Sequence, residues 1–214
     1  MLSQKYPENN YVYPMKGHLI TSVCSFAVFF LLVSFKPHEL AQYKVDITRS
    51  ALSWEGHKFF GGKHAGTIEL LNGTFEVADN KLTGGTFAID MNSIRVTDLT
   101  GETAEKLANH LKTDDFFDAV NFPQATFVIK RVEYADEQRA AVLGELTIRG
   151  IAQELAFPAT ITITDGKLNA SASNIRVDRT VHDAKYGSVR FFRDLGRKIV
   201  SDEFTLNLEI QAEL

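Results

Sequence analysis

The final eleven residues alternate between apolar and polar side chains without interruption. They read FTLNLEIQAEL from Phe204 to Leu214. A helix that buries one face repeats its apolar positions every three to four residues, whereas a β-strand places alternate side chains on opposite faces. The segment therefore predicts a strand with one buried face. Four other stretches share the alternation: residues 86–91, 125–129, 142–148 and 155–163.

Turn signals separate the alternating stretches. Asp165-Gly166 is a strong two-residue hairpin signal, and Asp79-Asn80 is a weaker one. Asn72-Gly73 predicts a turn or a bulge, and Gly144 predicts a tight bend. Pro158 cannot donate to a β-ladder, so we expect it at an edge or a bulge. Successive hairpins predict an antiparallel meander.

One segment has a helical period instead. Ala104, Leu107, Ala108 and Leu111 follow the spacing i, i+3, i+4, i+7, and Thr100 stands where a helix cap is expected. One short amphipathic helix and about eight to ten strands fit a single barrel. The predicted fold class is therefore all-β, an eight-stranded antiparallel barrel with one short helix. Such a barrel is either filled by side chains or holds one small ligand.

An apolar run precedes the predicted barrel. Residues 19–35 carry no charge, and Lys16 and Lys36 flank the run. Its length lies between that of a typical signal-peptide core and that of a membrane-spanning helix. We expect residues 1–42 to form a leader, either cleaved as a signal or retained as an N-terminal anchor, with translation starting at Met1 or Met15. Both roles predict that the domain at 43–214 is exported to the periplasm or secreted.

Charge and cysteine content exclude several classes of function. The chain has 23 Lys and Arg against 27 Asp and Glu, which argues against a nucleic-acid binder. Cys24 is the single cysteine, so no cysteine-based zinc cluster can form. The histidines beyond the leader show no metal-binding spacing, and no nucleophile motif is present. We therefore predict no catalytic residue, no metal and no cofactor.

Aromatic composition favours an apolar interior or cavity. The sequence has 16 Phe against one Trp and six Tyr, and phenylalanine has no polar group to place in a hydrogen-bonding cleft. The alternation predicts ten residues for a cavity wall: Trp54, Phe75, Phe87, Ile89, Leu111, Phe116, Phe117, Phe127, Leu146 and Phe157. Ordinary core packing produces the same alternation and stays the alternative for each of them.

Seven short segments are spaced along the predicted barrel. They are Tyr43-Lys44-Val45-Asp46 with Ser50 and Trp54, Gly73-Thr74-Phe75, His110 to Asp118, Pro123 with Phe127, Gly144 to Gly150, Asp178-Arg179-Thr180 and Val200-Ser201-Asp202. In this order and spacing they resemble the YceI-like family. The resemblance covers about residues 43–214. It implies a periplasmic or secreted, lipocalin-like barrel that holds a polyisoprenoid chain, such as a polyprenyl phosphate or a quinone tail, and it implies no catalytic residues.

A cationic stretch at 176–198 suits the head group of such a ligand. It carries seven Lys and Arg against three Asp. Because arginine forks match phosphate oxygens, Arg179 and Arg190 are the candidates for head-group binding. The alternative is a solvated loop, or an ion pair of Arg179 with a strand carboxylate such as Asp46. Aromatic residues within 186–192 suit a flap over the cavity or contact with a membrane.

The leading prediction is therefore a non-enzymatic carrier or sequestering protein of the envelope. Its predicted partner is an isoprenoid lipid, with a membrane nearby and a homodimer as an additional expectation. Two alternatives stay open. One is a structural or stress-response envelope module with a filled barrel that binds a partner on its surface. The other is an enzyme that acts on isoprenoid lipids and uses His57, His64 or Asp46 as acid or base.

Overall fold

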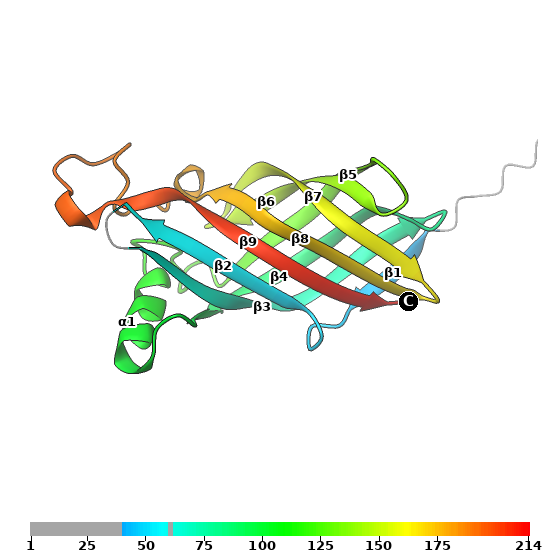
Figure 1. Cartoon of the computed structure of the whole chain (residues 1–214), viewed down its shortest axis with the longest axis horizontal. Coiled ribbons are helices and arrows are strands. Elements are labelled where there is room, and N and C mark those ends of the chain that lie inside the picture. The colour runs from blue at the N-terminus through cyan, green and yellow to red at the C-terminus, as the bar shows by residue number, and fades with distance from the viewer. Residues whose placement is uncertain (1–39, 60–61) are drawn as a thin grey trace, which may run out of the picture. The chain divides into compact units, whose positions relative to one another are not determined.

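The computed structural model describes residues 40–59 and 62–214. These residues form nine strands, one α-helix and two short 3-10 helices (Figure 1). In chain order the elements are β1 (Ala41–Val45), β2 (Ala51–Lys58), β3 (Lys63–Ala78), β4 (Lys81–Val96), α1 (Gly101–Leu111), β5 (Gln124–Tyr134), β6 (Arg139–Ile148), β7 (Ile151–Thr164), β8 (Lys167–Asp178), η1 (Arg179–His182), η2 (Gly196–Lys198) and β9 (Val200–Glu213). The predicted leader, with its apolar run at 19–35, lies outside the described residues, so its role stays a prediction.

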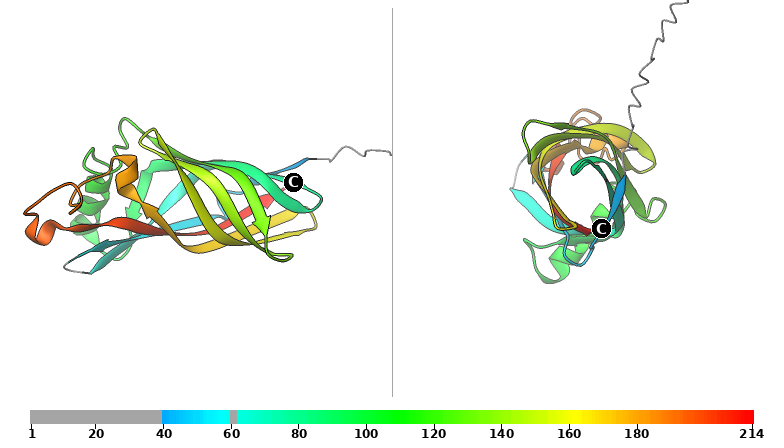
Figure 2. Two further views of the ribbon diagram at one scale, coloured as in Figure 1. Left: turned by 90° about the horizontal axis from the view of Figure 1, so that it is seen from above. Right: turned by 90° about the vertical axis from the view of Figure 1, so that its right-hand side faces the viewer.

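The strands close into an antiparallel barrel. Their order is β1-β3-β2-β9-β8-β7-β6-β5-β4, and the pairing of β3 with β4 completes the ring, which Figure 2 shows end-on. β1 pairs with β3 over 74–77, whereas β2 pairs with β3 over 63–68, and both also pair with β9. β1 and β2 therefore share one position, and nine strands fill eight positions. The prediction of an eight-stranded antiparallel barrel with one helix is confirmed.

Four of the five predicted strands lie within longer observed strands, and the fifth, at 204–214, lies in β9 except for Leu214. In β9 the alternation holds to the end, because Ile210 and Ala212 are buried while Glu209 and Glu213 are exposed. The inward faces of all nine strands contribute to one apolar cluster that fills much of the barrel. Among the described residues, no helix has the length and hydropathy of a membrane span.

Two predicted hairpin turns are confirmed. Asp165-Gly166 and Asp79-Asn80 each place both residues in the left-handed region, at φ 51° and 71° and at φ 49° and 58°. This is the conformation of a type I′ turn, which matches the twist of the two strands it joins. Arg149-Gly150 forms a third such turn, at φ 51° and 72°. It was not predicted, because arginine is a poor signal for a left-handed position. At Asn72 the β3–β4 register shifts, so that site is a bulge.

Gly144 and Pro158 occupy special places in the wall. Gly144 faces inward in the middle of β6, where an added Cβ would lie 2.4 Å from Cζ of Phe127. It makes room for a ring, and the shift of register lies beside it on β5. Pro158 pairs with Ala141 of β6 and has no ladder partner on β8. The proline therefore stands at a free strand edge, as expected, where its missing N–H removes no ladder bond.

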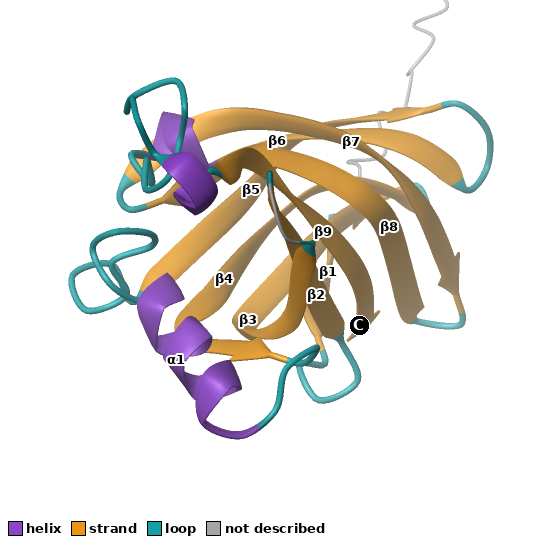
Figure 3. Cartoon of the chain, turned by 60° about the vertical axis from the view of Figure 1, so that its left-hand side comes forward, coloured by secondary structure: helices purple, strands orange, loops and turns teal. Residues whose placement is uncertain are grey.

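The predicted helix is present as α1 and packs against β4. Thr100 occupies its N-cap position, but the threonine side chain makes no capping hydrogen bond. Figure 3 shows α1 at one end of the barrel together with η1, η2 and the loops around them. We call this the helix end. At the opposite, hairpin end lie the β3–β4, β5–β6 and β7–β8 turns (Figure 1).

An apolar cavity inside the barrel as the candidate functional site

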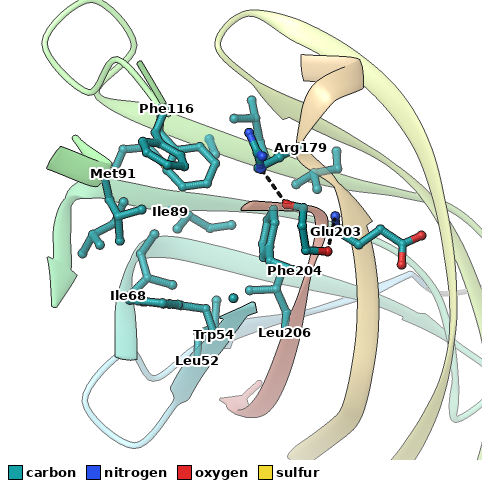
Figure 4. A pocket seen from close by; sticks show the side chains of 18 of the residues that line it. Leu52, Trp54, Ile68, Ile89, Met91, Phe116, Arg179, Glu203, Phe204 and Leu206 are labelled. Atoms are coloured by element: carbon teal, nitrogen blue, oxygen red, sulfur yellow. Dashed lines mark hydrogen bonds between the residues drawn. The ribbon is translucent and has the colours of Figure 1, made fainter. Parts of the chain in front are cut away.

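Two adjoining cavities occupy the barrel interior. The first, of about 120 Å³, lies toward the helix end, and Figure 4 shows Trp54, Ile68, Met91, Phe116 and Phe204 around it. The second, of about 90 Å³, lies deeper in the barrel. The cavities share four lining residues, which form a waist between them: Leu52, Ile89, Leu146 and Leu206. Almost all of the lining atoms are carbon.

All ten apolar residues predicted for the wall line these cavities. The first cavity has Trp54, Leu111, Phe116 and Phe117, the second has Phe75, Phe87, Phe127 and Phe157, and Ile89 and Leu146 border both. Sequence reasoning missed Met91, Phe204 and Leu206, which also line the interior. Since these three lie at inward positions of stretches already recognised as alternating, the same signal could have identified them.

Ring packing holds the aromatic wall in place. Phe75 and Phe87 meet edge to face with ring centroids 4.9 Å apart, and Phe127 and Phe157 lie 5.6 Å apart. Such aromatic pairs contribute about 0.5–1.5 kcal/mol beyond the area they bury. At Gly73, an added Cβ would lie 2.6 Å from the Phe87 ring, so this glycine is required for the ring to reach its position.

Trp54 presents carbon rather than nitrogen to the first cavity. Its indole Nε1 donates to the carbonyl oxygen of Thr67, 3.3 Å away in the wall. The ring lies so close to Gly66 that a Cβ there would approach Cζ2 to 2.5 Å. The polar atom of the tryptophan is therefore occupied within the wall, and its ring adds to the apolar lining.

Among the residues that the structure describes, Arg179 is the one Lys or Arg on the lining of either cavity. Its residue is only 3% exposed, and the guanidinium lies 5.5 Å from the Phe116 ring centroid. Its Nε donates to the Ser201 carbonyl at 2.9 Å and its Nη2 to the Val200 carbonyl at 3.2 Å, while its Nη1 donates to the Ala184 carbonyl. These bonds tie the 184–201 loop to the end of β8. Burial lowers the pKa of Arg179 below its usual value.

The carboxylate nearest to Arg179 belongs to Asp202, not to Asp46. Asp202 Oδ1 lies 3.9 Å from Arg179 Nη2 and is a buried oxygen without a hydrogen-bond partner among the described residues. Asp46 instead bonds Thr48 and Arg49 in an exposed turn, and these hydrogen bonds lower its pKa to about 2. The alternative of an ion pair with a strand carboxylate is therefore met by Asp202 of β9, and only the example of Asp46 was wrong.

Arg190 does not reach the cavity. Its side chain is 55% exposed and lies 3.1 Å from Asp178 Oδ2 and 3.0 Å from the Thr180 hydroxyl. Burial raises the pKa of Asp178, but hydrogen bonds from Thr180 and Arg190 outweigh that effect, so the net shift is downward. A role of Arg190 in head-group binding is thus not supported by its position.

Other cations of the 176–198 stretch also have carboxylate partners. Arg176 pairs with Glu203, and Lys185 lies 2.5 Å from Asp183. Some of the carboxylates that neutralise this stretch belong to β9. A count of charges within residues 176–198 does not include them. Its local positive charge is therefore smaller than the count of residues suggested.

Titratable side chains are few on the cavity lining. They are His57, Arg179 and Glu203. His57 is 48% exposed at the rim and lies 3.1 Å from Glu55. His64 lies 2.9 Å from Asp98 and does not line either cavity. The described residues contain no group of three or more His, Cys, Asp or Glu that could hold a metal ion.

His182 is a buried histidine that the sequence did not distinguish. Its residue is 2% exposed, and its Nδ1 lies 2.9 Å from the carbonyl oxygen of Ile151. Because a carbonyl only accepts, Nδ1 carries the proton and donates. Burial lowers the pKa of His182, since the charged ring would lose hydration. This bond joins η1 to the first residue of β7.

Comparisons with known proteins agree with the barrel. A UPF0312 protein of Pseudomonas putida (strain W619) is 33% identical over 129 residues, covering 56% of this chain and 62% of that protein. A UPF0312 protein of Pseudomonas fluorescens (strain SBW25) is 30% identical over 123 residues, with the same coverage. The chain therefore matches less than two thirds of the length of these curated relatives.

Solved structures share the fold at low sequence identity. BcnA of Burkholderia cenocepacia aligns with a TM-score of 0.58 at 21% identity, over 78% of this chain and 99% of BcnA. A polyisoprenoid-binding domain from Saccharophagus degradans aligns with a TM-score of 0.60 at 14% identity, over 82% of this chain and 99% of that domain. The sequence model of the YceI-like domain matches residues 43–212. The chain therefore belongs to the YceI-like domain family.

Proposed function

We propose that this protein binds one polyisoprenoid or related long-chain lipid inside the barrel and acts as a carrier or sequestering protein of the cell envelope. The observation that carries the proposal is the pair of adjoining apolar cavities that meet at a waist of four aliphatic residues. A filled barrel would leave no such space. The name of the Saccharophagus degradans domain, which shares the fold, supports the same class of ligand.

Apolar burial would drive such binding. Each buried CH₂ contributes roughly 0.8 kcal/mol, so one five-carbon isoprene unit gains on the order of 3–4 kcal/mol before ordering costs. Few polar contacts are then needed for affinity. Arg179 is the group that could meet a polar head, because two of its five N–H groups are not used by the three carbonyls.

The helix end is suited to contact with a membrane. Six large apolar side chains are exposed in segments at that end: Phe59, Val120, Val181, Val189, Phe191 and Phe192. Val120 is 87% exposed and Val189 63% exposed. Lys185 lies 5.0 Å from the Phe191 ring centroid and 2.5 Å from Asp183, and the same loop carries Arg193 and Lys198 together with Asp194. Aromatic and basic side chains together favour an anionic lipid surface. A lipid could then pass between the membrane and the first cavity.

A second candidate, an enzyme acting on lipids, has weaker support. His57 lies at the rim of the first cavity and 3.1 Å from Glu55, which does not line the cavity. The hydrogen bond from Lys63 lowers the pKa of Glu55, away from the range that acid–base catalysis at neutral pH requires. We therefore favour binding without catalysis.

The experiment is to purify the protein from its own envelope without detergent exchange, extract it with organic solvent and analyse the extract by mass spectrometry. A stoichiometric isoprenoid or related lipid is the expected result. Trp54, the only tryptophan of the chain, lines the first cavity, so its fluorescence reports on refilling by added lipid. No extracted lipid, combined with no fluorescence change on adding prenyl phosphates, would contradict the proposal.

A matched pair of variants localises the site. Ile89→Phe places a ring in the waist between the cavities, whereas Ala88→Phe places the same ring on the outer face of β4. We expect the first variant to lose at least tenfold in affinity, because the larger side chain obstructs the waist that a long ligand has to cross. The second should bind like the unaltered protein.

A further inference from the structure

A separate cleft lies on the outer surface of the helix end, apart from the barrel interior. Its volume is about 490 Å³, within the range of about 300–1,000 Å³ that is usual for small-ligand sites. The segment that follows α1, the β6–β7 turn and the loop that follows η1 form its walls, all at the end that Figure 3 shows with α1, η1 and η2. None of its lining residues lines either interior cavity. We call it the helix-end cleft.

The helix-end cleft is lined by equal numbers of basic and acidic side chains. The basic ones are Arg149, Lys185 and Lys198, and the acidic ones are Asp114, Asp115 and Asp183. An anion alone would meet three carboxylates there, and a cation alone would meet three basic groups. A ligand that carries both charges can place each of them beside its opposite. The lining therefore favours a zwitterion.

One cation and one carboxylate of the cleft are available to such a ligand. Lys185 lies 2.5 Å from Asp183, and its hydrogen bond lowers the pKa of that carboxyl, so this pair stays ionised and occupied with itself. The Lys198 ammonium and the Asp114 carboxylate are exposed, and neither has a hydrogen bond or an ion pair within the part of the chain that the structure describes. Opposite charges without partners thus line the same cleft.

Hydrogen bonds fix the wall that carries Asp114. The guanidinium Nη1 of Arg149 donates to the carbonyl oxygens of Asp114 and Phe116, each 2.7 Å away. These bonds tie the segment after α1 to the β6–β7 turn. In the same segment, Asp115 Oδ2 lies 3.0 Å from His110 Nε2 at the end of α1. The backbone that presents the free carboxylate is therefore held in place.

Ring contacts and one glycine fix the opposite wall. The Tyr186 ring lies 4.9 Å from the His110 ring and 5.1 Å from the Phe116 ring, between centroids, and so joins the loop to the segment after α1. Gly187 has φ 65°, and a Cβ there would lie 2.5 Å from the Lys198 carbonyl oxygen. The glycine therefore lets the backbone of Lys198 approach Tyr186. Because both walls are held, a ligand would pay little to order them.

Apolar side chains beside the charges indicate that the zwitterion belongs to a lipid. Phe192 lines the cleft and is 49% exposed, and Leu195 lines it as well. Phe191 and Val189 are exposed in the same loop. A free zwitterion such as an amino acid leaves these side chains in water. A lipid headgroup brings its acyl chains and the bilayer interface next to them.

The free carboxylate distinguishes between zwitterionic headgroups. A primary ammonium has three N–H groups that a carboxylate can accept, whereas a quaternary ammonium has none and is bound by aromatic cages. Tyr186 and Phe192 are the two aromatic residues on the lining, too few for a cage. The lipid that combines a phosphate with a primary ammonium and no further charge is phosphatidylethanolamine. Its two charges match those of Lys198 and Asp114.

We propose that the helix-end cleft binds the headgroup of phosphatidylethanolamine, with the lipid phosphate at Lys198 and the lipid ammonium at Asp114. The inference rests on the membrane contact in the proposed function and names the lipid that makes this contact specific. The interior cavities take no part in it. A headgroup bound there turns the helix end, and with it the first cavity, toward the bilayer.

The test is sedimentation with two sets of vesicles. One contains phosphatidylcholine with about one fifth phosphatidylglycerol, and in the other phosphatidylethanolamine replaces half of the phosphatidylcholine. The anionic lipid is constant, so the surface potential is the same and a difference reports the headgroup. We expect the unaltered protein to bind the second set about tenfold more tightly, because charge-assisted hydrogen bonds form at both ends of the headgroup. Asp114→Asn and Lys198→Gln should each reduce this preference to less than twofold.

Matched controls separate the cleft from the charge of the loop. Asp194→Asn and Arg193→Gln remove the same charges from residues that do not line the cleft, and both should keep the tenfold preference. The fluorescence of Trp54 on adding geranyl phosphate should be the same in all four variants as in the unaltered protein. That response shows that each variant is folded and that its interior is intact.

The outcomes separate this inference from the proposed function. If the unaltered protein sediments with neither set of vesicles, the membrane contact fails and the headgroup site fails with it. If both sets bind equally, or if the control variants lose the preference as fully as the cleft variants do, only the headgroup site is overturned. A missing fluorescence response to geranyl phosphate, with the vesicle preference intact, would count against the carrier role and for the headgroup site alone.

Discussion

Replacing Arg179 with methionine should destabilise the barrel strongly, because this side chain holds a loop through three backbone carbonyls. The change keeps the apolar stem but leaves the carbonyls of Ser201, Val200 and Ala184 without a side-chain donor. A buried acceptor left unsatisfied costs about 1–3 kcal/mol. Burial disfavours the charged form of Arg179, so removing this cation offsets part of that cost. The net loss is about 3 kcal/mol, the low end of the range for breaking a buried charged network.

Urea unfolding followed by tryptophan fluorescence measures this loss. The midpoint should fall while the slope stays constant, because the surface exposed on unfolding is the same. For a domain of this size, about 3 kcal/mol corresponds to a fall of roughly 6–12 °C in Tm. The matched control is Arg190→Met, since the Arg190 side chain is 55% exposed and its ion pair with Asp178 is worth at most about 1 kcal/mol.

The reasoning would be refuted if Arg179→Met unfolded within about 1 kcal/mol of the unaltered protein. The three carbonyls would then be satisfied by water, and the loop at 184–201 would be held by other contacts. If stability is unchanged while affinity for prenyl phosphates falls, Arg179 is a head-group ligand and not a structural tie. A loss of stability in Arg190→Met as large as that in Arg179→Met would equally contradict the argument from burial.

Three further predictions concern packing, pH and the helix end. Gly144→Ala should lower the free energy of unfolding by about 1–3 kcal/mol, because an added Cβ would lie 2.4 Å from the Phe127 ring. Urea unfolding measures this change, and an unchanged midpoint would show that the ring moves freely. Burial holds the pKa of folded His182 below the usual 6.5, so its contribution to stability is complete above pH 6.5 and is lost as pH falls below it. Urea midpoints measured from pH 8 to 5 should therefore decline less in His182→Gln than in the unaltered protein, and an equal decline in the two would contradict this reasoning. Replacing Phe191 and Phe192 with serine should weaken binding to anionic vesicles at least tenfold in a sedimentation assay, because both rings are exposed at the helix end. The fluorescence response to geranyl phosphate should stay intact. Equal vesicle binding by the variant and the unaltered protein would exclude the helix end as the membrane contact.

Alternation predicted the barrel well because each strand buries one face. The stretch at 204–214 was predicted as a strand and lies largely in β9, and the ten predicted wall residues all line the interior. Turn dipeptides placed two hairpins, since Asp, Asn and Gly reach left-handed conformations at low cost. These are local signals, so one sequence is enough to reveal them.

Long-range pairing could not be predicted in the same way. β1 and β2 share one barrel position because of the way they pair with β3 and β9. The residues of these pairs lie far apart in the chain. Arg179 illustrates the difficulty at the site. The sequence suggested a carboxylate or a phosphate as its partner, whereas the structure supplies carbonyls from 184 and 200–201. Backbone oxygens carry no sequence signature, so these acceptors could not be predicted.

The place of β9 in the ring has a consequence for how the protein folds. β9, the last strand in the sequence, pairs with β8 on one side and with β1 and β2 on the other, so it joins the first strands to the last. Until residues 200–213 are in place, the ring cannot close and both cavity walls face water. Contacts between residues about 150 positions apart, such as Trp54 with Leu206, make loop closure slow, and folding in milliseconds to seconds is expected. The apolar interior is thus enclosed only when β9 is paired on both sides, and a molecule present before that pairing can be enclosed without passing through any opening.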